Sequence, residues 1–332
     1  MIKRLGEYWR RIFFVTPKVP RHVDIEISTN CNLNCKMCKR DTIDFGNQMM
    51  PYETFTKIMD NLPKGVELIS FGGYGEMMMH PKFCDMVKYA KEKGHEVQTT
   101  SNGTLLATDE RMISVLESGI DTLRISIDHV REPEEEKDVG HVFSERLLKD
   151  LKRLNELRTQ GNYKIKLGIN TVVHKGNIGE IIDIIKCAED LGFDLVELIR
   201  LDLCKNRLER KLTLEKEKEV YGEVERMKKK IKVVTPANRF AKWKRLYNMN
   251  HDFCIFRLHT AHVRMNGAVS PCAVGFAVHD FGNIHEKSLK EIWNNEKFKK
   301  VHATAKNPVC QNCSIFKWGK SAEKSSQLPI IQ

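Results

Sequence analysis

The sequence has 332 residues, of which 41% are hydrophobic and 30% are charged, and its formal net charge is +11. This composition leaves ample apolar content for one large domain and a smaller one, and it excludes a fold that depends on disulfides. No apolar run is long enough to span a membrane and no secretory signal is found, so we expect a cytoplasmic protein.

The positive charge is concentrated in two segments. Residues 205–245 contain 15 Lys and Arg against 6 Asp and Glu, and five basic residues lie within the first 20. Such segments favour an acidic partner, such as a phosphate-bearing metabolite, an anionic lipid headgroup or nucleic acid. A solvated lysine-rich surface is the alternative that the sequence leaves open.

The chain begins with a basic amphipathic segment, residues 1–20. Its apolar side chains recur at helical spacing, at Ile2, Leu5, Trp9, Ile12 and Phe13. Residues 1–17 are therefore a candidate for contact with an anionic membrane surface, which suits a lipid substrate and a peripheral location. Alternatively, this helix packs on the open end of the barrel that the next segment predicts.

Residues 21–204 alternate short apolar runs with amphipathic stretches, which predicts repeated βα units around a parallel sheet. The predicted strands are Val23–Ser28, Val66–Phe71, Glu96–Thr100, Thr122–Ile127, Ile165–Val173 and Leu195–Leu201. The predicted helices are Tyr52–Asn61, Lys82–Lys93, Asp109–Ser118, Ser144–Arg158 and Gly179–Leu191, three of which end at Gly94, Gly119 and Gly192. Six repeats are fewer than the eight of a closed barrel.

Three cysteines follow the first predicted strand, at Cys31, Cys35 and Cys38. Three thiolates on one tight loop can hold three corners of a cubane iron-sulfur cluster, and no fourth cysteine lies nearby, so one iron would stay open. A zinc site or three reduced core cysteines are the alternatives. The cysteine spacing after a strand resembles the signature of the radical S-adenosylmethionine (radical SAM) enzymes.

This resemblance implies an open, partial (β/α)6 barrel of the TIM type, with which the count of six repeats agrees. In that family, SAM chelates the open iron. One electron from the cluster then cleaves SAM to a 5′-deoxyadenosyl radical, which abstracts hydrogen from a substrate. The resemblance also implies a one-electron donor such as flavodoxin or ferredoxin, and sensitivity to oxygen. Cys31, Cys35 and Cys38 are then the catalytic cluster ligands, and Met37 is assigned to the cofactor-binding residues.

A glycine-rich loop follows the second predicted strand, with the sequence Phe71-Gly72-Gly73-Tyr74-Gly75-Glu76. Glycines let the backbone approach a ligand closely, and a glutamate can accept a hydrogen bond from an ammonium group. The matching loop of the family binds the SAM amino group, so the resemblance assigns this role to Gly73, Gly75 and Glu76. Met77 replaces the proline that often follows the glutamate.

Polar residues end the next three predicted strands. Ser126 and Asp128 alternate with apolar residues, so both should point to the inside of the barrel. In similar enzymes, such groups bind the ribose and carboxylate of SAM, and the candidates here are Ser101, Asn102, Ser126, Asp128 and, on the adenine side, Asn170. A strand-end serine that bonds only to its own turn is the alternative.

The bridge 205–250 is predicted to be basic and helical, and the segment 251–332 is a second, small domain. This domain contains Cys254, Cys272, Cys310 and Cys313, which can close a second cubane or a zinc site. The array resembles the twitch domain, the shortened form of the SPASM domain, and implies an auxiliary [4Fe-4S] cluster. Structural zinc is the alternative. Cys204, just past the sixth strand, is expected to be a buried thiol, with a hydrogen-atom donor or extra ligand as the alternative.

The function expected first is a radical SAM oxidoreductase that acts on an anionic small-molecule, sugar or lipid substrate. The auxiliary cluster would assist oxidation or position the substrate. A peptide-modifying SPASM maturase, of the cross-link or formylglycine type, is the alternative. A zinc-containing nucleic-acid-binding protein is disfavoured, because few aromatic residues accompany the basic bridge.

Overall fold

The computed structural model of the protein describes residues 16–35, 38, 40, 46–131, 144–201, 212–236, 255–273, 279–303 and 310. Several sequence-based predictions fall outside these residues: the amphipathic segment up to residue 15, and Met37, Cys204, Cys254 and Cys313. Among the described residues, no helix combines the length and the apolar character that a membrane span requires.

One nine-stranded sheet forms the centre of the fold, in the order β7-β6-β5-β4-β3-β2-β1-β8-β9. Neighbouring strands are parallel from β7 to β8, and β9 pairs antiparallel with β8. The strands are β1 (His22–Ile25), β2 (Leu68–Phe71), β3 (Glu96–Ser101), β4 (Thr122–Ser126), β5 (Lys166–Val173), β6 (Leu195–Arg200), β7 (Lys232–Val234), β8 (Thr260–Val263) and β9 (Val269–Ser270).

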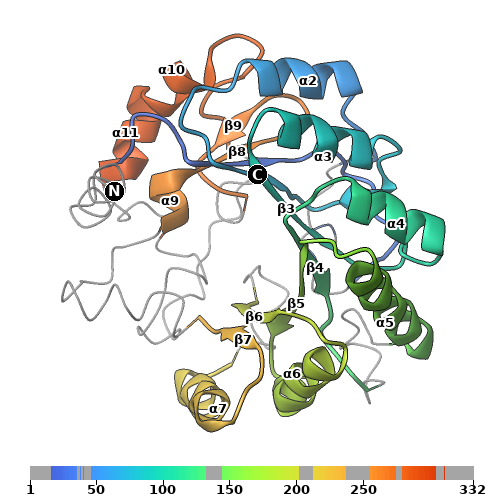
Figure 1. The fold of residues 1–332 in the computed structure, drawn as a ribbon. Helices are drawn as coiled ribbons and strands as arrows, with labels where there is room; N and C mark the ends of the chain where they lie inside the picture. The colour runs from blue at the N-terminus through green and yellow to red at the C-terminus, as the bar shows by residue number, and fades with distance from the viewer. Residues whose placement is uncertain are drawn as a thin grey trace, which may run out of the picture.

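Helices α2 to α7 form an arc around the curved strands, and α9 to α11 lie together near β8 and β9 (Figure 1). The α-helices are α2 (Tyr52–Asp60), α3 (Phe83–Glu92), α4 (Asp109–Glu117), α5 (Glu145–Gln160), α6 (Ile181–Asp190), α7 (Leu214–Arg226), α9 (Ile255–His259), α10 (Leu289–Trp293) and α11 (Glu296–Ala303). Two 3-10 helices are η2 (Met77–Met79) and η4 (Ile178–Glu180).

The predicted parallel α/β fold is confirmed, and each of the six predicted strands is present within a few residues of its expected ends. The three helix-ending glycines have the positive φ angles that end a helix, 85° at Gly94, 79° at Gly119 and 68° at Gly192. The sequence analysis did not predict β7, β8 or β9. Because β8 pairs with β1, the C-terminal part of the chain extends the barrel sheet. The domain boundaries themselves stay predictions.

The strands alternate between an apolar outer face and a polar inner face. On β1, Val23 and Ile25 are fully buried in the hydrophobic core, whereas His22 and Asp24 face the inside of the curved sheet. Phe71 at the end of β2 packs against Phe55 of α2 and Phe83 of α3, with ring centroids 5.6 and 5.8 Å apart. These buried rings hold α2 and α3 on the sheet and fix the loop that follows β2.

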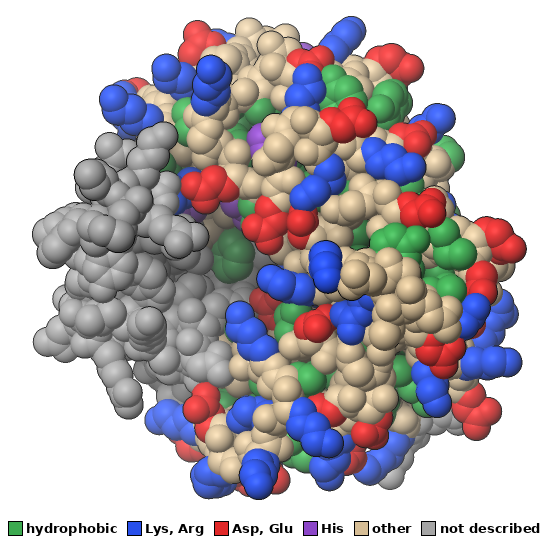
Figure 2. Space-filling view, viewed as in Figure 1, with side chains coloured by type: hydrophobic (Ala, Val, Ile, Leu, Met, Phe, Trp, Pro, Cys, Tyr) green, Lys and Arg blue, Asp and Glu red, His purple; other side chains and the backbone are tan. Residues whose placement is uncertain are grey.

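Surface charge does not separate by sign on the face shown in Figure 2, where Lys and Arg side chains are interspersed with Asp and Glu. The predicted basic bridge is described only for 212–236, which contains α7 and β7. Over the described part of this face, therefore, no single-sign patch marks a docking site for an acidic partner.

Candidate active site

The three cysteines after β1 are close together, half-buried and free of disulfides. The backbone N–H of Cys38 donates to the carbonyl of Cys35 at 2.9 Å, which makes a tight turn between them. Burial raises the pKa of the Cys35 thiol to about 12, and the neighbouring Asp128, Cys38 and Cys31 raise this pKa further. The chain thus brings three thiols and the Asp128 carboxylate into one small volume.

Three thiols are the donor set that the irons of a cubane cluster take. Among the described residues, no three His, Cys, Asp or Glu side chains converge on one point as ligands of one ion. Each thiolate of a cubane binds a different iron, so the three thiols need proximity and not convergence. A buried thiol with a raised pKa keeps its proton at neutral pH, and it releases this proton when a metal binds to the sulfur.

The glycine-rich loop is bound tightly to the backbone that leads into the cysteine loop. The N–H of Glu76 donates to the carbonyl of Asn30 at 2.6 Å. A Cβ atom at Gly75 would lie 2.2 Å from the carbonyl oxygen of Ser28 and 2.8 Å from that of Asn30. Only glycine fits at position 75, and the two loops are consequently fixed relative to each other.

The carboxylate of Glu76 is buried and already accepts three hydrogen bonds. Oε1 accepts from the Ser101 hydroxyl at 2.9 Å and from the Met78 N–H at 3.0 Å, and Oε2 accepts from the Asn102 N–H at 2.7 Å. Burial raises the pKa of Glu76 despite these bonds. A carboxylate has about four acceptor positions, so about one remains for an external ammonium group.

Asn102 holds the cysteine loop through its side chain. Its amide donates to Asn32 Oδ1 at 2.8 Å, and Asn32 in turn donates to the Thr104 hydroxyl at 2.8 Å. Asn32 lies between Cys31 and Cys35, so this network positions the cluster ligands. The structure therefore brings Ser101 and Asn102 to the predicted site, where their observed partners are protein groups.

The predicted residues of β4 and β5 lie side by side at the same end of the sheet. Ser126 pairs with Asn170 in the β4–β5 register. Asp128 is buried, and its Oδ1 accepts from the Val172 N–H at 2.8 Å. The Oδ1 atom of Asn170 and that of Asn30 are buried without a hydrogen-bond partner. An orphaned acceptor just before Cys31 and another beside Ser126 are consistent with a donor-bearing ligand at this end of the sheet.

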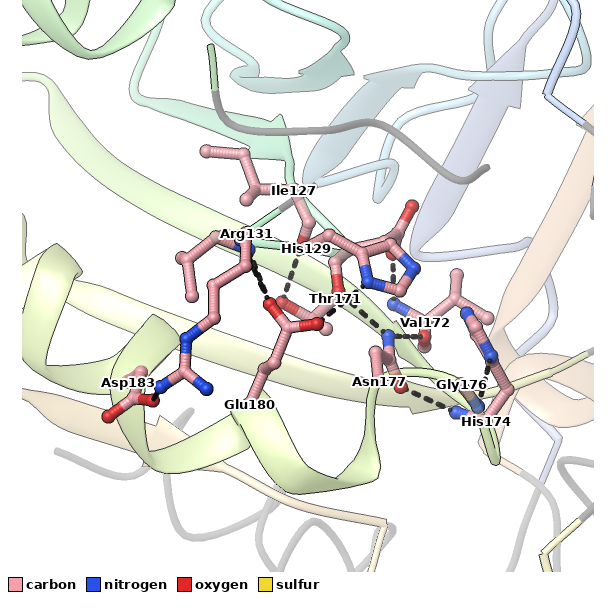
Figure 3. Close-up of polar contacts among 12 residues, drawn as sticks. Ile127, His129, Arg131, Thr171, Val172, His174, Gly176, Asn177, Glu180 and Asp183 are labelled. Atoms are coloured by element: carbon pink, nitrogen blue, oxygen red, sulfur yellow. Dashed lines mark hydrogen bonds and ion pairs between the residues drawn. The ribbon is translucent and has the colours of Figure 1, made fainter. Parts of the chain in front are cut away.

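Sequence reasoning missed two residues that fix these strand ends, Asn177 and Glu180. The Asn177 amide donates to the carbonyls of Asp128 and Val172, at 2.9 and 2.8 Å. The Glu180 carboxylate points to the chain after β4 (Figure 3), where it contacts His129 Nδ1 at 2.9 Å and accepts from the Arg131 N–H at 3.1 Å. Their spacing after a strand, Asn-x-x-Glu, was the available signal.

The C-terminal segment reaches the same region. Cys272 is half-buried just past β9, and Cys310 is buried. The other two predicted ligands of the auxiliary cluster lie outside the described residues. The hydroxyl of Tyr74, in the glycine-rich loop, donates to the carbonyl of Ala273 at 3.0 Å. The glycine-rich loop and the segment of Cys272 are therefore in direct contact.

A chamber of about 250 Å³ lies inside the curved sheet, and Gly72 and Cys272 are both part of its wall. The other lining residues include the polar side chains His22, Asp24, Ser70, Gln98, Thr100 and Arg124. Closed barrels fill this space with branched apolar side chains. Here several of the polar side chains are bonded to one another, and most of the surface that the chamber exposes is apolar.

A row of hydrogen bonds crosses the chamber from strand to strand. His22 contacts the hydroxyls of Thr260 and Ser70 at 3.2 and 2.6 Å, and Gln98 donates to Ser70 at 2.7 Å. Burial lowers the pKa of His22, which favours the neutral ring. The row continues from Gln98 to Arg124 at 3.0 Å.

The charged groups of the chamber are paired. Arg124 Nε lies 3.0 Å from a carboxylate oxygen of Glu197, and Asp24 lies 2.9 Å from His262 Nδ1. Burial lowers the pKa of Arg124. An ion that enters the chamber must compete with these existing partners, whereas a hydroxyl group need not.

Comparison with known proteins identifies two domains. Residues 25–188 match the Radical SAM superfamily, and residues 254–314 match SPASM, an iron-sulfur cluster-binding domain. A tungsten-containing aldehyde ferredoxin oxidoreductase cofactor-modifying protein from Pyrococcus furiosus is 28% identical over 89% of this chain and 87% of that protein. The PqqA peptide cyclase of Bradyrhizobium diazoefficiens is 24% identical over 90% of this chain and 79% of that protein.

Solved structures have the same fold. Streptococcus suis SuiB bound to the precursor peptide SuiA matches with a TM-score of 0.70 and 16% identity, over 95% of this chain and 73% of that chain. The native anSMEcpe structure with AdoMet and a peptide matches with a TM-score of 0.61 and 17% identity, over 85% and 82%. The chain therefore belongs to the radical SAM superfamily, in its SPASM/twitch subgroup, and is an iron-sulfur enzyme that uses S-adenosylmethionine with a SAM-binding and an auxiliary [4Fe-4S] cluster.

Proposed function

We propose that this enzyme breaks a C–H bond of a small, hydroxyl-bearing substrate, such as a sugar, that is held in the chamber between the glycine-rich loop and Cys272. Bound cluster and SAM together supply a carbon-centred radical that removes a hydrogen atom from such a bond. In this proposal Cys31, Cys35 and Cys38 hold the SAM-binding cluster. The auxiliary cluster is held by the C-terminal cysteines Cys254, Cys272, Cys310 and Cys313.

The protein's own groups would hold SAM beside the cysteine loop. Glu76 accepts from the ammonium group at its remaining acceptor position, and Gly73 and Gly75 let the backbone approach it. Ser126 faces the ribose, and Asn170 lies on the adenine side, where its orphaned Oδ1 atom supports contact with a ligand donor. Asp128 stands beside Cys35. Met37 is kept in the proposal as a cofactor-binding residue on the sequence alone.

One observation carries the proposal: the chamber wall contains Gly72 from the loop assigned to SAM and Cys272 from the auxiliary ligands. A substrate in the chamber would touch both sides, so hydrogen abstraction on one side and electron acceptance on the other are both within reach. A flavodoxin or ferredoxin would supply the one electron that the cleavage of SAM consumes.

The size and chemistry of the chamber favour a sugar-like substrate over a lipid or an anion. A space of about 250 Å³ is too small for a lipid chain with its headgroup. Ser70, Gln98 and Thr100 contribute hydroxyl and amide groups to the wall, of which those of Ser70 and Gln98 already bond to His22, to each other and to Arg124. A substrate hydroxyl can both donate and accept, so it can join such a network. Arg124, the strongest anion-binding group of the wall, is already paired with Glu197. Residues 1–17 as a membrane contact stay a separate, untested proposal.

A peptide-modifying activity is the second candidate, because the PqqA peptide cyclase aligns along 90% of this chain. In that case one side chain would enter the chamber, and the rest of the peptide would lie outside it. The match to a cofactor-modifying protein, at the higher identity of 28% over 89% of this chain, favours a small molecule instead.

The test uses anaerobically reconstituted protein with SAM and reductant. Metabolite fractions from cells are added, and 5′-deoxyadenosine is measured by mass spectrometry. We expect a neutral, hydroxyl-rich fraction to stimulate its formation, and a Ser70→Phe variant, which fills the chamber, to lose the stimulation but keep basal cleavage. Thr159→Phe, on the exposed face of α5, is the control. Stimulation by a peptide fraction alone would favour the second candidate.

A further inference from the structure

Glu26 connects the glycine-rich loop to the C-terminal part of the sheet. It follows β1 directly, and only 3% of its surface is exposed. Its carboxyl group accepts from the backbone N–H of Tyr74, at 3.4 Å. The backbone N–H of Met265, in the turn between β8 and β9, is near enough to lower the pKa of this carboxyl group. Its own N–H donates to the carbonyl of Val263 at 2.9 Å. One side chain thus contacts two segments that are far apart in the sequence.

The glycine-rich loop rests directly on this carboxyl group. Gly73 has a φ of 147°, and a Cβ atom there would lie 2.5 Å from Glu26 Oε1. The carboxyl group therefore occupies the space that a side chain at position 73 would need. Any movement of the loop toward the barrel would push on Glu26, and movement away would break its contact with Tyr74.

Keeping a carboxyl group in this place is energetically costly. Burial raises the pKa of Glu26, and His262 and the two backbone N–H groups only partly oppose that rise. None of its observed contacts is with a cysteine or with the residues assigned to the SAM ribose. Its contacts are instead divided between the glycine-rich loop and the β8–β9 turn.

A second contact joins the same two segments. The Tyr74 hydroxyl donates to the carbonyl of Ala273, next to Cys272. The backbone N–H of Tyr74 is therefore linked to the β8–β9 turn through Glu26. The side-chain hydroxyl of Tyr74 contacts the Cys272 segment directly. Two contacts of Tyr74 thus connect the glycine-rich loop to the C-terminal part of the chain, one through Glu26 and one to Ala273.

We propose that Glu26 is a positioning residue that transmits the SAM-bound arrangement of the glycine-rich loop to the β8–β9 turn. The proposal rests on the assignment of this loop to SAM under the proposed function. A ligand that is held better by one arrangement of the loop shifts the turn toward the matching arrangement.

The test is hydrogen–deuterium exchange of the anaerobic, reconstituted holoenzyme with and without SAM. In the wild type, we expect SAM to slow exchange both in residues 72–76 and in residues 262–270. In Glu26→Gln, the amide keeps the shape but accepts from only one of the two N–H groups. Protection of 72–76 should persist and protection of 262–270 should be lost, with SAM affinity about 10-fold weaker.

Glu117→Gln, on the exposed side of α4, is the matched control and should behave as the wild type. Tyr74→Phe is a milder variant that removes only the hydroxyl contact, and it should reduce SAM-dependent protection of residues 270–273 at nearly unchanged SAM affinity. It also keeps the test informative if Glu26→Gln fails to fold, which iron content and circular dichroism reveal.

Equal protection of residues 262–270 by SAM in Glu26→Gln and wild type would overturn the proposal. So would a wild-type protein that binds SAM without any change in these residues. Failure of the proposed function has a different signature, because the wild type would then bind no SAM or would cleave it without response to any substrate fraction.

Discussion

The hydroxyl of Tyr74 lies 3.0 Å from the carbonyl oxygen of Ala273, although the two residues are 199 positions apart in the sequence. Tyr74 belongs to the loop that packs against the cysteine loop, and Ala273 follows Cys272. This contact joins the glycine-rich loop to the segment of Cys272, and Gly72 and Cys272 both line the same chamber.

Replacing Gly75 with alanine should remove SAM binding without removing iron. The added Cβ atom would lie 2.2 Å from the Ser28 carbonyl oxygen, so the glycine-rich loop must move away from the cysteine loop. We expect SAM affinity, measured by titration calorimetry, to fall by at least about 10-fold. Gly179→Ala is the control, because no atom lies within 4 Å of its added Cβ. Unchanged affinity in Gly75→Ala would contradict the assigned loop.

Replacing Glu180 with glutamine should loosen the chain after β4. Oε2 of the carboxylate accepts from the N–H groups of Val130 and Arg131, at 2.8 and 3.1 Å, and Oε1 contacts His129 Nδ1 at 2.9 Å. A carboxamide replaces one of these two oxygens with an NH2 group, so one side of this network is lost. We expect the free energy of unfolding in urea to fall by about 1–3 kcal/mol. Hydrogen exchange should become faster at residues 127–131. An unfolding curve that coincides with the wild type would contradict this role.

The ion pair between Arg124 and Glu197 should be costly to break from one side. Both side chains are 19% exposed, and the pair is 3.0 Å apart. In Arg124→Gln, Glu197 would lose its nearby positive charge, and we expect about 3–5 kcal/mol lower stability to urea. The double variant Arg124→Gln/Glu197→Gln should recover a large part of this loss. A double variant that is less stable than either single variant would exclude charge burial as the cause.

His302 should make the protein less stable in mild acid. Burial, with Arg257 and His259 nearby, lowers the pKa of His302 from 6.5 to about 4. Between these values the unfolded chain binds a proton that the folded protein does not, so the free energy of unfolding falls as the pH drops from 6.5 toward 4. Urea unfolding at pH 7.5, 6.5 and 5.5 measures this slope. His302→Gln should flatten it and His285→Gln, at an exposed position, should not; equal slopes would exclude His302 as the source.

The sequence predicts the long strands well because their apolar runs carry their own periodicity. The strands that were missed have two to four residues, as in β8 (Thr260–Val263) and β9 (Val269–Ser270). β1 and β2 also have only four residues, but they lie within longer apolar runs of the sequence. The place of β8 and β9 in the sheet depends on β1, more than 200 positions away, so only the folded chain reveals it.

At the site, the sequence predicts which residues gather, but not what they contact. Ser101 and Asn102 reach the expected place, yet Ser101 bonds to Glu76, 25 positions away, and Asn102 bonds to Asn32, 70 positions away. The role of Glu26 is equally invisible in the sequence, since it depends on contacts with Tyr74 and Met265. Spacing identifies a ligand set, whereas the groups that support it come from distant segments.

The most direct test of the account is the iron, sulfide and zinc content per chain of anaerobically reconstituted protein, compared with the Cys31/Cys35/Cys38→Ala variant. Two cubane clusters predict about 8 iron in the wild type and about 4 in the variant, with no zinc. About 4 iron and one zinc in the wild type would contradict the auxiliary cluster, and absence of iron would contradict the whole account.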